Sequence, residues 1–144
     1  MRNKVGDTAR LYEIVMYCER IAKAVIAFEG RYDKFIDNDH ERDCDACAFY
    51  IGQIGKFVNK LSKEFRAEHS EVDWREIVSL RNSIVHAYKS VRKNRIWNVM
   101  RNKIPLLNTT CRRLLFELDP TAEADLREEL GETIDAGDQT NPET

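Results

Sequence analysis

Residues 80–91 read Leu-Arg-Asn-Ser-Ile-Val-His-Ala-Tyr-Lys-Ser-Val, and this stretch decides how the rest of the chain is interpreted. It places Arg81, His86 and Tyr88 inside an otherwise apolar helical pattern. An arginine keeps its charge, whereas a histidine titrates near neutral pH, so the pair suits chemistry on a phosphodiester. The same spacing is also compatible with a packed helix end that carries one surface arginine.

The residues before this stretch predict where its helix begins. Asp73-Trp-Arg-Glu76 has the form of a capping box, which predicts a helix that starts at Trp74. Apolar residues then follow at steps of three, four and four, which places them on one face: Ile77, Leu80, Ile84 and Tyr88. Tyr88 is therefore also a candidate for the last core residue of this helix.

Apolar residues at helical spacing predict further helices on both sides. Their expected bounds are Asp7 or Thr8 to about Glu29, about Arg42 to about Glu68, about Lys93 to about Leu118 with a bend at Pro105, and Pro120 to near Gly131. Four long amphipathic helices with short connections predict an all-α, up-and-down four-helix bundle with a short fifth C-terminal helix. We expect one domain, residues 1–131, and a disordered acidic tail, residues 132–144.

Two glycines interrupt the second predicted helix. Gly52 and Gly55 each cost about 1 kcal/mol of helix stability relative to alanine. A helix that keeps such residues often approaches another backbone closely. The pair therefore predicts a tight contact with a neighbouring helix or subunit.

Composition narrows the class of protein. The chain has 144 residues, 42% hydrophobic and 33% charged, with six Gly and three Pro, which favours one helical domain. It has neither an apolar run of about 18 residues nor an apolar N-terminal segment, so we expect a soluble, cytoplasmic protein with no membrane partner.

The cysteines and histidines do not form a recognisable metal motif. Cys44-Asp-Ala-Cys47 follows His40 with the spacing of half a zinc site, but a second ligand pair is missing. The four cysteines are expected to be reduced, and packing in the core explains their positions better than a zinc site does. We predict no metal and no cofactor.

The net charge of -2 hides a strong asymmetry. Between Ile77 and Phe116 there is no Asp or Glu, whereas nine cations occur; from Glu117 onward ten acids face Arg127 alone. Such a basic segment is typical of proteins that bind a polyanion, although it could also be a solvated face. Candidate RNA contacts directly follow the motif: Lys89, Arg92, Lys93 and Arg95.

Metal-free cleavage of RNA needs a base for the 2′-hydroxyl proton, a cation for the phosphorane and an acid for the leaving 5′-oxygen. Arg81 and His86 could cover these roles between them. On a straight helix, however, five residues separate their directions by about 140°. Either the helix distorts here or a second chain completes the site. Asn82 lies four residues before His86, where its side chain could orient the imidazole.

Arg81-Asn-Ser-Ile-Val-His86-Ala-Tyr88 resembles the R-x4-H-x-Y signature of HEPN-domain ribonuclease toxins, the HepT-like partners in HEPN/MNT toxin–antitoxin pairs. The resemblance runs from about Leu11 to Leu118. It includes Ile54-Gly55, Leu61-Ser62, Val72-Asp-Trp-Arg-Glu-Ile-Val78, Trp97 and Ile104-Pro105-Leu106. The chain departs from the pattern at Lys56, where many relatives carry Glu, and at Ala87, which replaces the usual glycine.

The resemblance implies a homodimer in which Arg81 and His86 of both protomers line one cleft. It implies a metal-independent endoribonuclease that leaves a cyclic phosphate and a 5′-hydroxyl. Such an enzyme would be the toxin of a type VII-like pair, neutralised by a nucleotidyltransferase antitoxin that attaches AMP to Tyr88. The alternative is a non-catalytic HEPN-like helical module that binds a nucleotidyltransferase or nucleic acid.

Overall fold

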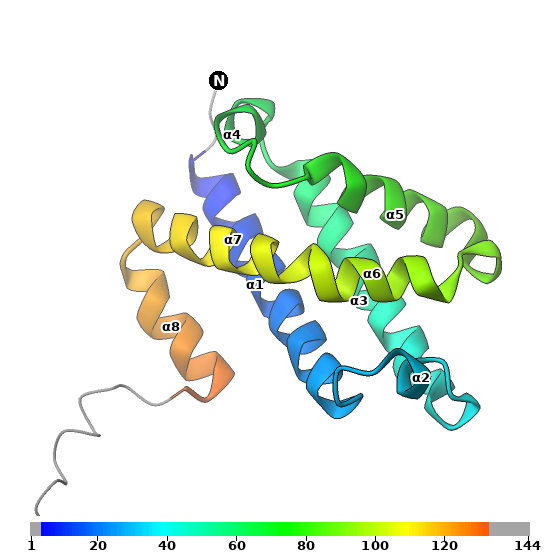
Figure 1. Cartoon of the computed structure of the whole chain (residues 1–144). Coiled ribbons are helices and arrows are strands. Elements are labelled where there is room, and N and C mark those ends of the chain that lie inside the picture. The colour runs from blue at the N-terminus through cyan, green and yellow to red at the C-terminus, as the bar shows by residue number, and fades with distance from the viewer. Residues whose placement is uncertain (1–3, 133–144) are drawn as a thin grey trace, which may run out of the picture.

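A computed structural model describes residues 4–132, and the regular elements in this range are all helices, as predicted (Figure 1). In chain order they are α1 (Lys4–Ala27), α2 (Tyr32–Phe35), the 3-10 turn η1 (Asn38–His40), α3 (Glu41–Lys60), α4 (Lys63–Glu68), α5 (Trp74–Ala87), the 3-10 turn η2 (Tyr88–Ser90), α6 (Lys93–Asn102), α7 (Ile104–Leu118) and α8 (Thr121–Leu130). No helix in this part of the chain has the length and hydrophobicity needed to span a bilayer.

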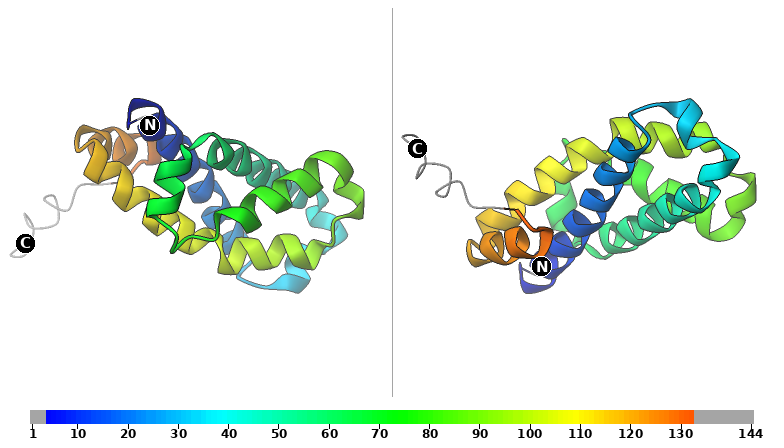
Figure 2. Two further views of the ribbon diagram at one scale, coloured as in Figure 1. Left: turned by 90° about the horizontal axis from the view of Figure 1, so that it is seen from above. Right: turned by 90° about the horizontal axis from the view of Figure 1, so that it is seen from below.

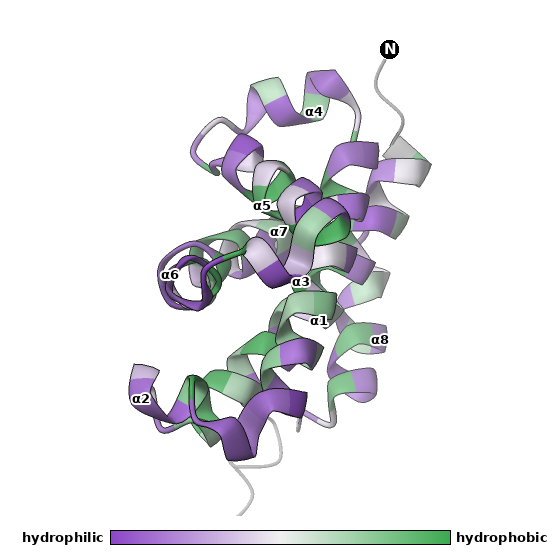
Figure 3. Ribbon diagram, turned by 90° about the vertical axis from the view of Figure 1, so that its right-hand side faces the viewer, coloured by the Kyte–Doolittle hydropathy of each residue, from purple (hydrophilic) through white to green (hydrophobic). Residues whose placement is uncertain are grey.

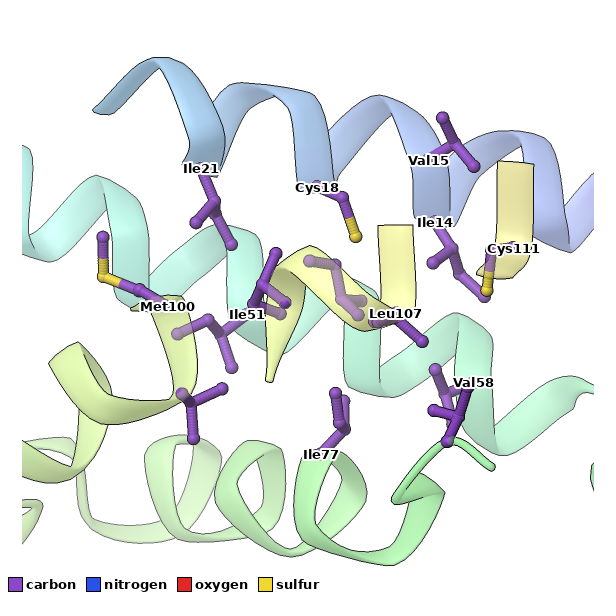
Figure 4. Close-up of a cluster of buried hydrophobic side chains, with 14 of the residues drawn as sticks. Ile14, Val15, Cys18, Ile21, Ile51, Val58, Ile77, Met100, Leu107 and Cys111 are labelled. Carbon is purple, nitrogen blue, oxygen red and sulfur yellow. The ribbon is translucent and has the colours of Figure 1, made fainter. Parts of the chain in front are cut away.

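The core lies where α1 packs against α3 and α7, and α3 packs in turn against α5. The view from below shows α1 between α3 and α7 (Figure 2). Figure 4 shows buried side chains from several helices meeting in one cluster, among them Ile14, Ile51, Ile77 and Leu107. Complete burial of such a side chain contributes about 1.5–3 kcal/mol, so this cluster fixes the position of α5.

The second predicted helix is two helices in the structure. At Leu61 and Ser62 the backbone is extended, and the Ser62 hydroxyl accepts a hydrogen bond from the Phe65 amide that opens α4. The carboxylate of Asp7 accepts bonds from the Ser62 amide and hydroxyl, both at 2.9 Å. Asp7 or Thr8 was expected to begin the first helix, but Asp7 lies buried inside α1 and holds this break instead.

The predicted fourth helix is also divided. Lys103 separates α6 from α7, although Figure 1 shows the two helices following nearly the same direction. Pro105 lies in the first turn of α7, where its missing N–H has no helical partner to lose. The proline therefore starts a new helix rather than bending one.

The connection after α1 and Glu132 after α8 both have defined contacts. The connection after α1 contains α2, whose buried Phe35 meets Phe28 edge to face at 5.3 Å. Gly30 has a φ of +64°, as expected of a residue that ends a helix. The acidic tail, residues 133–144, lies outside the described residues, whereas Glu132 still pairs with Arg112 at 2.5 Å.

Candidate active site

Helix α5 carries the motif and begins where the sequence predicts. The Asp73 carboxylate accepts a hydrogen bond from the Glu76 amide at 3.1 Å. Instead of completing the capping box, the Glu76 carboxylate lies 3.4 Å from the guanidinium of Arg95 on α6. The start of α5 is thus fixed both by its own cap and by the next helix.

The position of Arg81 depends on Gly55 of α3, which has no side chain. A Cβ added to Gly55 would lie 2.3 Å from the Cβ of Arg81 and 3.3 Å from the carbonyl oxygen of Ile77. Only glycine permits this approach of α3 to α5. The predicted tight contact is therefore present at Gly55. It is absent at Gly52, where an added Cβ would meet nothing within 4 Å.

The guanidinium of Arg81 has unused donors. Its Nη1 donates to Oδ1 of Asn82 at 3.3 Å, and its Nε is buried without a partner among the described residues. No ion pair in residues 4–132 involves Arg81 either. A buried donor without an acceptor is costly, and an anion at this position would supply one.

His86 lies in the last turn of α5 and is exposed. Within residues 4–132 its ring makes no hydrogen bond, ion pair or ring contact, so both nitrogens remain available for proton transfer. Asn82 shares the helix face of His86, yet its Oδ1 accepts from Arg81 rather than orienting the imidazole. Asn82 therefore connects to the arginine of the motif.

The helix remains regular through His86. It ends at Ala87, whose φ of -159° and ψ of 56° are not helical. The distortion follows the histidine and does not reduce the angle of about 140° between the Arg81 and His86 positions. The side chain of Arg81 nevertheless turns toward Asn82, on the His86 side of the helix.

Tyr88 is fixed by a residue that the sequence did not single out. Its ring is half-buried against the core, and its hydroxyl donates to the carboxylate of Asp45 on α3. Burial and, next, this hydrogen bond raise the pKa of the Tyr88 phenol well above its usual value. Asp45 is the last of four aspartates, Asp37, Asp39, Asp43 and Asp45, and the helix dipole alone explains acidic residues around the N-terminus of α3.

The predicted RNA contacts divide into two groups. Lys89 and Arg92 are exposed on η2 and at the start of α6, with Lys93 half-buried beside them. Arg95 turns inward and donates from Nη1 to the Ser83 hydroxyl at 3.2 Å. Figure 3 shows the ribbon at the α6 label coloured mostly as hydrophilic. Lys89 and Arg92 are therefore open to solvent near the motif, Lys93 is only partly so, and Arg95 joins α6 to α5.

Cys44 and Cys47 are part of the core, and Cys44 lies beside the hydroxyl of Tyr88. All four cysteines are free and buried, and burial raises the pKa of the Cys47 thiol to about 12. Across residues 4–132, no three His, Cys, Asp or Glu side chains are grouped so that they could hold a metal ion. These thiols behave as small apolar core groups.

Comparison with known proteins places this helical chain in a family. The model of the family described as "Ribonuclease HepT-like" matches residues 12–114, so the chain belongs to the HepT-like ribonuclease family. The match includes the whole of α3 and α5, and with them the contact between Gly55 and Arg81.

Several curated proteins are similar to it. "Putative RNase TTE0752" of Caldanaerobacter subterraneus is 39% identical over 62 residues, which cover 43% of this chain and 55% of that protein. "Putative RNase MJ1380" of Methanocaldococcus jannaschii is 30% identical over 100 residues, covering 67% and 85%. "Probable ribonuclease HepT" of Thermococcus cleftensis is 32% identical over 54 residues, covering 38% and 49%. No solved structure matches the chain.

Proposed function

We propose that this protein is a metal-independent endoribonuclease whose reacting groups are Arg81 and His86. The observation that carries the proposal is the state of the two side chains. Arg81 is held against Gly55 with a buried, unpartnered Nε, and His86 is exposed with no partner in residues 4–132. The family and the names of its members support ribonuclease chemistry.

The reaction assigns one role to each group. His86 takes the proton of a 2′-hydroxyl, whose oxygen then attacks the adjacent phosphorus. Arg81 donates to the phosphorane oxygens, and Asn82 holds the guanidinium toward them. The 5′-oxygen leaves with a proton from an imidazolium, which gives a cyclic phosphate and a 5′-hydroxyl.

A homodimer would bring two copies of this site together. Phe49 on α3 and Val85 on α5 are large apolar residues that remain 58% and 56% exposed. Along the two helices they lie between the Asp45–Tyr88 and Gly55–Arg81 contacts. Apolar side chains exposed beside a candidate site are typical of an interaction surface, and a second copy of the chain would cover them. Phe49→Asp should then reduce both the dimer mass in sedimentation and the rate of RNA cleavage.

The biological role that we propose is the toxin of a type VII-like toxin–antitoxin pair, in which the partner is a nucleotidyltransferase of the MNT type. Transfer of AMP from ATP joins the Tyr88 oxygen to the α-phosphorus and releases pyrophosphate. The phenol proton leaves to a base, and the oxygen can no longer donate to Asp45. Modification therefore both adds negative charge beside the site and removes this tie to α3.

The central test is an RNA cleavage assay in the presence of a chelator. The parent protein should cleave RNA, and His86→Ala should lose about 10²- to 10⁴-fold in rate. Tyr88→Phe should retain cleavage but gain no mass of AMP after incubation with the antitoxin and ATP. Cleavage by His86→Ala at the parental rate would refute the mechanism. Binding without turnover by the parent would favour a non-catalytic helical module.

A further inference from the structure

We infer that a groove between α4 and α5 binds the backbone of single-stranded RNA and leads it to the motif. This inference extends the proposed ribonuclease function by naming where the substrate strand lies. The groove has a volume of about 960 Å³ and is lined by residues from 66 to 83. Its walls are joined by Trp74, whose indole N–H donates to the carbonyl oxygens of Arg66 at 3.2 Å and His69 at 2.9 Å.

The groove is continuous with the candidate active site. Helix α5 contributes Arg75, Ser79 and Asn82 to its lining, at steps of four and three. His86 follows after four more residues, so these side chains share one helix face. Asn82 accepts from Arg81 at 3.3 Å, which places the guanidinium of the motif at this end of the groove. From Arg75 to His86 the helix rises roughly 16 Å, enough for several nucleotides of one strand.

The cations of the groove lack partners, whereas its acids have them. Within residues 4–132 the side chains of Arg66 and Arg75 make no hydrogen bond or ion pair, and Nε of Arg66 is buried. By contrast, Glu71 lies 3.4 Å from the guanidinium of Arg113. Asp73 caps α5 and lies 3.8 Å from the ammonium of Lys103. The charge left for a ligand is therefore positive.

The chemistry of the lining favours a phosphodiester over other anions of the same charge. Guanidinium groups bind phosphate oxygens in a two-pronged geometry, which suits Arg66 and Arg75. The hydroxyl of Ser70 and the carboxamide of Asn82 supply neutral hydrogen-bonding groups of the kind that contact phosphates and 2′-hydroxyls. Nε of Arg66 in the groove and Nε of Arg81 next to Asn82 are both buried donors without partners among residues 4–132.

The test uses the full chain with the His86→Ala substitution, in chelator, so that RNA is bound without being cut. Affinity for a labelled single-stranded oligoribonucleotide is measured by fluorescence anisotropy at several salt concentrations. Arg66→Gln and Arg75→Gln should each raise Kd about tenfold. Each should also reduce the slope of log K against log salt by about 0.7.

Arg127→Gln is the matched control, because it makes the same charge change on α8, where Arg127 pairs with Glu123 at 2.9 Å. It should leave Kd within a factor of two of its parent. Equal RNA affinities of the Arg75→Gln and Arg127→Gln proteins would refute the proposal that this groove binds RNA. Arg75 is exposed, so this comparison holds even if Arg66→Gln fails to fold. This binding experiment does not depend on cleavage. If the parent cleaves RNA but the groove substitutions leave Kd unchanged, only this inference is refuted. If the parent does not cleave RNA, only the proposed function is refuted.

Discussion

The two ends of the motif on α5 are held in opposite ways. Arg81 lies where α5 meets the backbone of α3, and Gly55 leaves no space between them. His86 lies at the free end of the helix, and the chain beyond it is tied to α3 by the hydroxyl of Tyr88. The difference fits the chemistry: a cation that stabilises charge must be fixed, whereas a group that exchanges protons needs access to substrate and solvent.

The largest effect on stability and cleavage is expected from a substitution at Gly55, where α3 and α5 are closest. Gly55→Ala would place a Cβ 2.3 Å from that of Arg81, so α3 and α5 must separate. We expect a loss of about 1–3 kcal/mol in the free energy of unfolding, together with loss of cleavage because the guanidinium moves. Urea unfolding and the RNA assay measure the two effects.

Gly52→Ala is the matched control for that substitution. It adds the same methyl group three residues earlier in α3, where nothing lies within 4 Å. Replacing a helical glycine there should increase the free energy of unfolding by up to about 1 kcal/mol. Equal effects of the two substitutions would mean that helix propensity, rather than contact with α5, determines the result at Gly55.

The sequence predicted the surroundings of Arg81 better than those of His86 and Tyr88. Helical periodicity and the capping box located α5, and the two glycines indicated a close contact without showing which of them makes it. That choice depends on which face of α3 meets α5, and each glycine lies four residues after a buried residue of α3, Ala48 for Gly52 and Ile51 for Gly55. The chain also contains contacts that no local pattern encodes. Asp45 meets Tyr88 across 43 residues, and Asp7 meets Ser62 across 55.

The groove cations were missed for a related reason. Arg66 and Arg75 precede the acid-free segment, in a stretch where Glu71 and Asp73 make the local charge look balanced. Glu71 is paired with Arg113, as only the fold reveals, and Asp73 caps α5, as the capping box predicts. A charge count along the sequence does not separate paired groups from unpaired ones.

The smaller effect is expected at the Tyr88 end and depends on pH. Tyr88→Phe removes the hydrogen bond to Asp45, which should lower the free energy of unfolding by about 1 kcal/mol at neutral pH. Asp45→Ala should act on the same bond, so the two substitutions together should cost less than their sum. Tyr32→Phe is the control, since the Tyr32 hydroxyl has no hydrogen-bond partner in residues 4–132.

The sign of the pH dependence follows from the raised pKa of the Tyr88 phenol in the folded protein. The folded state favours the protonated phenol, whereas the unfolded chain releases that proton near its ordinary pKa of about 10. The stabilisation is therefore complete below pH 10 and is lost as the pH rises from there toward the folded pKa. The difference between parent and Tyr88→Phe, measured by urea unfolding, should be constant from pH 7 to 9 and should shrink above 10. If the difference in the free energy of unfolding grows above pH 10, the folded state favours the phenolate. The Tyr88 hydroxyl then does not donate a hydrogen bond to Asp45.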